Sequence, residues 1–277
     1  MLDDLADLSA LGESLRRHDH DRFVTAMFAP PERRADLWVL YAFNLELSQI
    51  RSQVREPLAG MIRLQWWRDV VEGTRREEAL RHPVGGKLLR LIESRQLPLT
   101  HFHRLLEGRE RDFDAIPFAS IADWQAYGQD TSGALTHLAA LVLGHEAAAA
   151  QPVGTVWALT GLLRSLPFHL AQGWMTLPVE ALRAAGLEPE MVAAAKADKA
   201  ALAAVVMNLL ALVQEQLVQA RRHKAPRAAI AALLPAVLAA AYGRRMRALG
   251  GDVFDSRSFR PHPMPIRLAV AAMLGRF

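Results

Sequence analysis

Cysteine is absent from this chain of 277 residues, and its absence removes several kinds of chemistry at once. Without cysteine there is no disulfide, no thiolate zinc site and no cysteine nucleophile, and the composition fits a reducing compartment. Charge of one sign is also scarce, because the formal net charge is only +4 and no run of five like charges occurs. We therefore expect no nucleic-acid partner, since that function needs a concentrated basic surface.

Short motifs for catalysis and metal binding are missing as well. The chain contains no HExxH, GxSxG or GxGxxG pattern, and Gly85-Gly86-Lys87 lacks the rest of a phosphate-binding loop. His101 and His103 lie two apart in a segment expected to be helical, so their side chains point to different faces. We expect the histidines to be solvated or to cap helices, and we predict no metal-binding residue.

Strand signals are also almost absent, because alternating runs of Val, Ile and Thr do not occur. Instead, Ala, Leu, Arg, Glu and Gln dominate, and apolar residues recur every three or four positions. No linker is long enough to divide the chain. The sequence predicts one all-α domain over residues 1–277, with a layered or barrel-like core. The predicted helices span residues 3–17, 31–54, 57–78, 84–96, 98–114, 120–145, 152–172, 196–223, 226–249 and 264–275.

Long hydrophobic runs are limited to residues 200–213 and 228–242, and both are shorter than the roughly 18–20 residues that span a bilayer. We expect them to be buried helices of a soluble, cytoplasmic protein. The start of the chain is acidic, unlike a signal or transit peptide. Residues 264–277 combine apolar bulk with Arg267 and Arg276. That pattern is typical of a helix lying on a membrane surface, or of a terminal helix docked on the core.

The segment LLRSLPFHLAQGWMTLP, residues 162–178, carries an unusual set of polar residues in an apolar helix. Ser165 and His169 are four apart and share one face. Pro167 lies between them and should kink the helix, because it removes a backbone hydrogen bond. Arg164 is expected either to contact an anion or to be a buried arginine in an ion pair. Its candidate partners are Asp112, Asp130 and Glu46.

Three blocks in this order resemble the squalene/phytoene synthase family. YAFN (41–44), followed by RLQWWRD (63–69), resembles the start of the family's YAFCR..DD..D region. YGQDTSGALTHLAALVLG (127–144) and GTVWALTGLLRSLPFHLAQGWMTLP (154–178) resemble its Y...VAG.VG and G.A.Q..N..RD...D...GR.YLP helices. The blocks cover residues 20 to 180 approximately. The resemblance implies an isoprenoid-synthase-like helical bundle with a central apolar cavity.

Two aspartate-rich motifs bind Mg²⁺ in the active enzymes of that family, and the resemblance implies that this chain has lost both. Mg²⁺ prefers hard oxygen ligands and neutralises the leaving diphosphate, whereas hydroxyls, amides and imidazole do not supply that charge. The aspartates fall on Ser48, Gln49 and Ser52 in the first motif and on Ser165 and His169 in the second. Two family arginines fall on Leu45 and Trp174, whereas Tyr41, Asp112, Tyr127 and Arg164 are retained.

Within the family, this loss together with YAFN.E, RLQWWRD and LLR..PFH resembles a non-catalytic branch that helps to assemble respiratory complex I, the NADH:ubiquinone oxidoreductase. The resemblance implies an inactive protein whose partner is a complex I subunit or assembly intermediate. Its location would be peripheral on a bacterial inner membrane, or on the matrix side in a mitochondrial relative. The alternatives are a head-to-head isoprenoid transferase with altered metal ligation, and a ligand-free helical interaction protein.

No catalytic residue is assigned, and no cofactor is expected unless the transferase alternative holds, which would require Mg²⁺. We predict instead a pocket for an isoprenoid or lipid at the former metal end of the bundle. Its predicted lining is Tyr41, Leu45, Ser48, Gln49, Ser52, Tyr127, Thr131, Leu135, Leu162, Arg164, Ser165 and His169.

Overall fold

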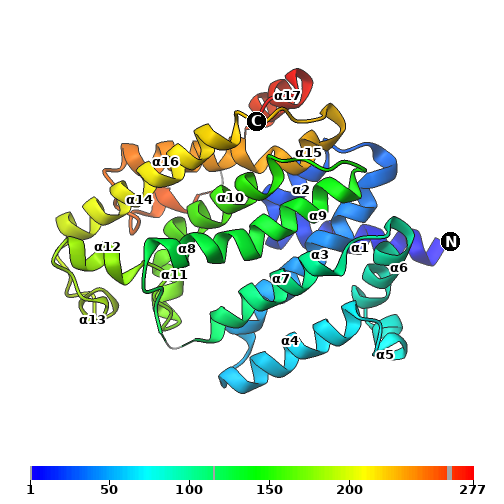
Figure 1. Cartoon of the computed structure of the whole chain (residues 1–277), viewed down its shortest axis with the longest axis horizontal. Helices are drawn as coiled ribbons and strands as arrows, with labels where there is room; N and C mark the ends of the chain where they lie inside the picture. The colour runs from blue at the N-terminus through cyan, green and yellow to red at the C-terminus, as the bar shows by residue number, and fades with distance from the viewer. Residues whose placement is uncertain (1, 115, 261–263) are drawn as a thin grey trace.

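The computed structural model of the protein describes residues 2–114, 116–260 and 264–277, and over these residues it contains helices and no strand. The longer helices run side by side as a bundle, with shorter ones at its ends (Figure 1). The all-α prediction is therefore confirmed. The longer helices are α1 (Leu2–His18), α3 (Pro31–Gln53), α4 (Pro57–Val71), α6 (Gly85–Arg95), α7 (Leu99–Glu110), α10 (Ala150–Arg164), α14 (Lys199–Ala220) and α16 (Pro235–Ala248).

The core lies where α3, α7, α9 (Ala134–Val142) and α10 meet. Phe43 of α3 and Phe102 of α7 are fully buried, and their ring centroids are 5.8 Å apart. Leu135 and Leu138 of α9 have no exposed surface. Burial of such side chains supplies the main favourable free energy of folding, about 1.5–3 kcal/mol for each large one.

Several predicted helices are divided for local reasons. The predicted segment 57–78 is α4 followed by α5 (Arg76–Arg81), with Gly73 between them at a φ of +78°, which favours glycine. The segment 226–249 is a 3₁₀ turn (Arg227–Ala229), then α15 (Ile230–Leu233), then α16, which begins at Pro235 because proline cannot donate the next helical hydrogen bond.

The predicted kink at Pro167 is confirmed. Helix α10 ends at Arg164, and α11 (Leu166–Ala171) begins after Ser165 with Pro167 in its first turn. The backbone dihedral angles of Ser165, φ −94° and ψ 9°, lie outside the α-helical region. Proline suits a first turn because its missing N–H has no helical partner there.

The predicted helix 120–145 contains a wide turn. Helix α8 (Ile121–Gly128) continues into a π-helix (Gln129–Gly133) and then into α9. Two glycines let neighbouring helices approach this π-helix closely. A Cβ on Gly154 of α10 would lie 2.1 Å from the carbonyl oxygen of Ser132, and one on Gly108 of α7 would lie 2.9 Å from Cγ2 of Thr131. The π-helix is thus fixed between α7 and α10.

Three short helices were not predicted. Helix α2 (His20–Ala26) follows Asp19, whose side chain accepts a hydrogen bond from the backbone nitrogen of Arg22 at 3.3 Å. Such a cap defines a helix start. Helices α12 (Val179–Ala184) and α13 (Pro189–Ala193) are shorter still, so they carry little apolar periodicity.

The two apolar runs lie in helical segments that are longer than the runs themselves. Lys199–Ala220 and Arg227–Ala248 each contain 22 residues and are long and apolar enough, by length and composition, to cross a membrane. The apolar window of the second is 89% buried within the protein and that of the first is 39% buried, with α14 packed on α10 and α16. Core helices pass the same test, so it is weak support for a membrane span.

Candidate functional site

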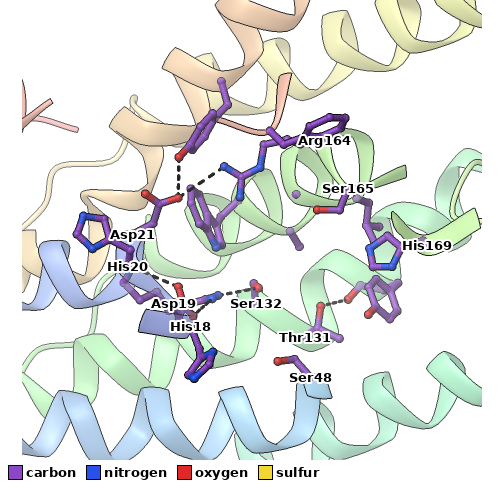
Figure 2. A pocket seen from close by; sticks show the side chains of 18 of the residues that line it. His18, Asp19, His20, Asp21, Ser48, Thr131, Ser132, Arg164, Ser165 and His169 are labelled. Carbon is purple, nitrogen blue, oxygen red and sulfur yellow. Dashed lines mark hydrogen bonds and ion pairs between the residues drawn. The ribbon is translucent and has the colours of Figure 1, made fainter. Parts of the chain in front are cut away.

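A cleft of about 450 Å³ lies at the end of the bundle where the sequence places the former metal motifs. It brings Ser48 of α3 together with Ser165 and His169 at the junction of α10 and α11 (Figure 2). The wide π-helix adds the hydroxyls of Thr131 and Ser132. The predicted pocket residues that line this cleft are Ser48, Tyr127, Thr131, Leu162, Arg164, Ser165 and His169.

The remaining predicted pocket residues do not line this cleft. Tyr41 and Leu135 are packed in the core, with 2% and 0% of their surface exposed. On α3, Leu45 packs against the core. Gln49 directly follows Ser48 but is not part of the lining, and Ser52 lies one turn beyond Ser48. Along α3 the predicted pocket residues pass from the buried core at Tyr41 to solvent at Ser52. Only Ser48 among them lines the cleft.

Charged and polar side chains make up most of the cleft lining. A long apolar cavity through the bundle, which the resemblance implies, is not shown by the part of the chain that the structure describes. Arginines outnumber carboxylates in the lining itself, but each of them pairs with a carboxylate. The partners of Arg22 and Arg164 lie inside the lining, and those of Arg17 and Arg109 lie outside it. The charged side chains are Arg17, Arg22, Arg109 and Arg164 against Asp19 and Asp21.

One wall of the cleft consists of residues 17–22, which the sequence-based prediction missed. The Arg22 guanidinium donates to the Asp19 carboxylate at 2.9 Å and to the Ser132 hydroxyl at 3.1 Å. It also lies near the rings of Tyr41 and Trp157, 5.9 and 5.8 Å from their centroids. The available signal was the unbroken run of ionisable residues RRHDHDR, which is unusual at a helix junction.

Arg164 does form an ion pair, but its predicted partner was wrong. Its Nη1 lies 3.6 Å from Oδ2 of Asp21, and its guanidinium carbon lies 4.0 Å from the ring centroid of Tyr242. The Tyr242 hydroxyl donates to the same Asp21 oxygen at 2.8 Å. The prediction failed because Asp21 belongs to α2, which was not expected. The predicted partners that are not used are Asp112, Asp130 and Glu46.

Asp112, the retained family aspartate, is part of a buried network. The Tyr127 hydroxyl donates to Asp112 at 2.7 Å and accepts from Arg109 at 3.1 Å, while Arg109 also contacts Asp112 at 3.3 Å. Burial and the Asp112 carboxylate raise the pKa of Tyr127, so the phenol keeps its proton. Burial raises the pKa of Asp112, and Arg109 opposes that shift. Only 3% of the surface of Asp112 is exposed, and its carboxylate oxygens are occupied by Tyr127 and Arg109.

His169 is a neutral side chain in this cleft. Burial lowers its pKa to about 4, and the charges of Arg109 and Arg51 act in the same direction. Its Nδ1 is buried and has no hydrogen-bond partner among the described residues. The Trp174 ring stands edge-on to the imidazole, 4.7 Å between centroids, and the Arg51 guanidinium carbon lies 5.4 Å from the centroid of the same ring. Arg51 thereby places a cation beside Trp174, the position at which the resemblance predicts a replaced family arginine.

The donors in the cleft do not fit Mg²⁺. The Ser48 hydroxyl donates to a backbone carbonyl of its own helix at 2.9 Å. The carboxylates of Asp19 and Asp21 already pair with Arg22 and Arg164. Within residues 2–114, 116–260 and 264–277, no group of three or more His, Cys, Asp or Glu side chains is placed to hold a metal ion. Mg²⁺ prefers several anionic oxygen ligands, so no magnesium-dependent step follows from these residues.

Comparison with known proteins places this geometry in context, since a sequence profile of the squalene/phytoene synthase family matches residues 15–265. The chain belongs to the squalene/phytoene synthase family. The family match extends well beyond the three blocks that the sequence analysis recognised. The crystal structure of squalene synthase from Alicyclobacillus acidocaldarius superposes with a TM-score of 0.75, covering 90% of this chain and 96% of that one at 18% identity, and so shows the same fold.

Relatives of two kinds in the squalene/phytoene synthase family are similar to the chain. NADH dehydrogenase (ubiquinone) complex I, assembly factor 6 from Rattus norvegicus is 27% identical over 248 residues, which cover 87% of this chain and 74% of that protein. Phytoene synthase from Thermus thermophilus is 27% identical over 232 residues, which cover 81% of this chain and 78% of that protein. The comparisons therefore establish the family of this chain. They do not distinguish between the two roles of its relatives, so the choice between those roles rests on the residues of the cleft.

Proposed function

We propose that this member of the squalene/phytoene synthase family is a non-catalytic assembly factor for respiratory complex I. The observation that carries the proposal is the composition of the cleft. Ser48, Ser165 and His169 converge where the family's metal-binding aspartates belong, and they are neutral. The similarity to relatives named complex I assembly factor 6 supplies the role.

The same cleft is proposed to bind an isoprenoid or lipid through an anionic head group. Arg17 and Arg109 line it, and their carboxylate partners Glu13 and Asp112 lie outside the lining. Ser132 and Thr131 add hydroxyl groups. Charge-assisted hydrogen bonds from guanidinium groups are well suited to phosphate oxygens. Binding of this kind needs no metal, because the arginines supply the positive charge.

Deletion of the gene in the source cell is expected to lower NADH:quinone oxidoreductase activity in isolated membranes. Succinate:quinone oxidoreductase activity in the same membranes should stay constant, because that enzyme is assembled independently of complex I. A plasmid copy should restore the lost activity. Unchanged NADH:quinone oxidoreductase activity after deletion would count against the assembly role.

A second candidate function is an isoprenoid transferase with altered metal ligation, which is favoured by the two carboxylates of Asp19 and Asp21 in the cleft lining. We expect the purified protein to release no pyrophosphate from farnesyl or geranylgeranyl diphosphate with Mg²⁺, because Arg22 and Arg164 already neutralise both groups. An active synthase assayed in parallel is the control. Pyrophosphate release that disappears in Asp19→Asn, which keeps the helix cap, would establish the transferase instead.

A further inference from the structure

Helix α17 (Pro265–Leu274) presents its apolar side to solvent. Ile266, Val270 and Met273 are spaced four and three residues apart, so they share one face, and 80%, 43% and 70% of their surface is exposed. Leu268, on the opposite face, is 1% exposed and faces the bundle. A surface helix of a globular protein normally has the reverse arrangement. This apolar face is therefore fitted to contact something other than water.

Basic side chains gather at the C-terminal end of α17. A pocket of about 500 Å³ lies between the end of α14 and the end of α17, and its lining is mostly basic. A Cβ on Gly275 would lie 3.2 Å from Cγ of Arg227, so the end of α17 lies against the segment that follows α14. Burial and the charge of Arg267 lower the pKa of Arg221. We call this set the basic rim. Its members are Arg221, Arg222, Lys224, Arg227, Arg267 and Arg276.

Carboxylates that could neutralise the basic rim are scarce. Residues 216–277 contain eleven of the 33 Lys and Arg residues but only two of the 29 Asp and Glu residues, Asp252 and Asp255. Asp255 pairs with Arg257 at 2.6 Å. Among the residues that the structure describes, Arg222 and Lys224 form no ion pair, and the Arg221 guanidinium donates to the carbonyl oxygen of Phe277 at 2.6 Å. The rim therefore has few carboxylates in its part of the sequence to compensate its positive charge.

We propose that α17 and the basic rim dock on a membrane that contains anionic phospholipid. In that position Ile266, Val270 and Met273 enter the boundary between head groups and acyl chains, and the rim contacts lipid phosphates. Figure 1 shows α17 at the edge of the molecule beyond the bundle, where a flat surface can reach it. One helix with an apolar outer face and flanking cations matches an interfacial membrane helix. The proposal does not depend on the complex I role.

Vesicle flotation of the full chain tests this proposal. We expect binding to phosphatidylcholine vesicles with about 30% phosphatidylglycerol, little binding to phosphatidylcholine alone, and release at about 0.5 M NaCl. Each basic side chain near an anionic surface contributes about 5-fold, so removal of two positive charges in Arg222→Glu with Lys224→Glu should weaken partitioning by at least roughly 30-fold, and the added carboxylates should weaken it further. Ile266→Ser with Met273→Ser should also reduce binding, because those side chains supply the apolar contact.

Matched controls separate this surface from general effects of charge and hydrophobicity. Lys196→Glu with Lys199→Glu changes the net charge equally but near the start of α14, and Leu58→Ser with Ile62→Ser removes apolar residues that are 71% and 62% exposed on α4, at the opposite edge of the molecule. Both control proteins should bind as the unaltered protein does, and circular dichroism should show all variants folded. Equal loss in the controls, equal binding to both vesicle types, or full release by millimolar inorganic phosphate at constant ionic strength would overturn the proposal.

Discussion

Replacing Asp112 with alanine is expected to lower the free energy of unfolding by about 3–5 kcal/mol, because the buried charge of Arg109 loses its carboxylate. Only 13% of the Arg109 side chain and 5% of the Asp112 side chain are exposed. The Tyr127 hydroxyl would also lose the acceptor that it contacts at 2.7 Å. Urea denaturation followed by far-UV circular dichroism measures the change.

Two further variants separate a buried network from an ordinary ion pair. Asp130→Ala removes a pair with Arg104 whose side chains are 32% and 42% exposed, so its cost should stay below about 1 kcal/mol. The double variant Arg109→Met with Asp112→Leu removes both charges and should recover much of the loss, since an apolar pair needs no compensation. Similar losses for Asp112→Ala and Asp130→Ala would show that the network contributes no more than a surface contact.

Most of the fold was predictable because its helices are long enough to repeat the apolar pattern. Helix α3 begins at Pro31 and α4 at Pro57, as the preference of proline for a first turn predicts. Helix α2 was missed because its seven residues, HDRFVTA, complete fewer than two turns and carry no repeated apolar spacing. The π-helix could not be predicted from the sequence either, since it is packed closely against Gly108 of α7 and Gly154 of α10, and contacts between helices are not visible in the sequence.

The candidate site was predictable only along individual helices. The four-residue spacing of Ser165 and His169 predicted that they face the same site, and both line the cleft. The resemblance to the family predicted that Ser48 joins them, and it also lines the cleft. Contacts between elements were not predictable in this way. The pairing of Arg164 with Asp21 joins α10 to α2, so it requires the packing of the whole bundle. Charge alone offered Arg164 several equally plausible partners.

The two carboxylates of the cleft, Asp19 and Asp21, lie at the start of α2 and connect the walls of the cleft. Asp19 holds Arg22, which reaches Ser132 of the π-helix, and Asp21 links Arg164 of α10 to Tyr242 of α16. Ion pairs and hydrogen bonds within the chain thus connect the walls of the cleft. The two carboxylates stabilise a set of paired charges within the cleft.

Gly154→Ala is expected to destabilise the protein by about 1–3 kcal/mol, because the added Cβ meets backbone atoms that cannot rotate away. That carbon would lie 2.1 Å from the carbonyl oxygen of Ser132 and 2.6 Å from the Thr136 hydroxyl. Relief requires the π-helix and α10 to separate, and that movement would draw Ser132 away from the Arg22 guanidinium. The urea midpoint reports the loss of stability, and hydrogen exchange of the Ser132 amide reports the local displacement.

Gly161→Ala is the matched control, since Gly161 lies in the same helix two turns later. Apart from its own stretch of helix, no atom of the described residues lies within 4 Å of its added Cβ. Alanine should stabilise α10 there by up to about 1 kcal/mol, because it loses less backbone entropy in a helix than glycine does. The two substitutions are chemically identical, so opposite signs would isolate the contact between α10 and the π-helix. If both raised the urea midpoint, the close approach at Gly154 would not be what fixes Thr131 and Ser132 in the cleft.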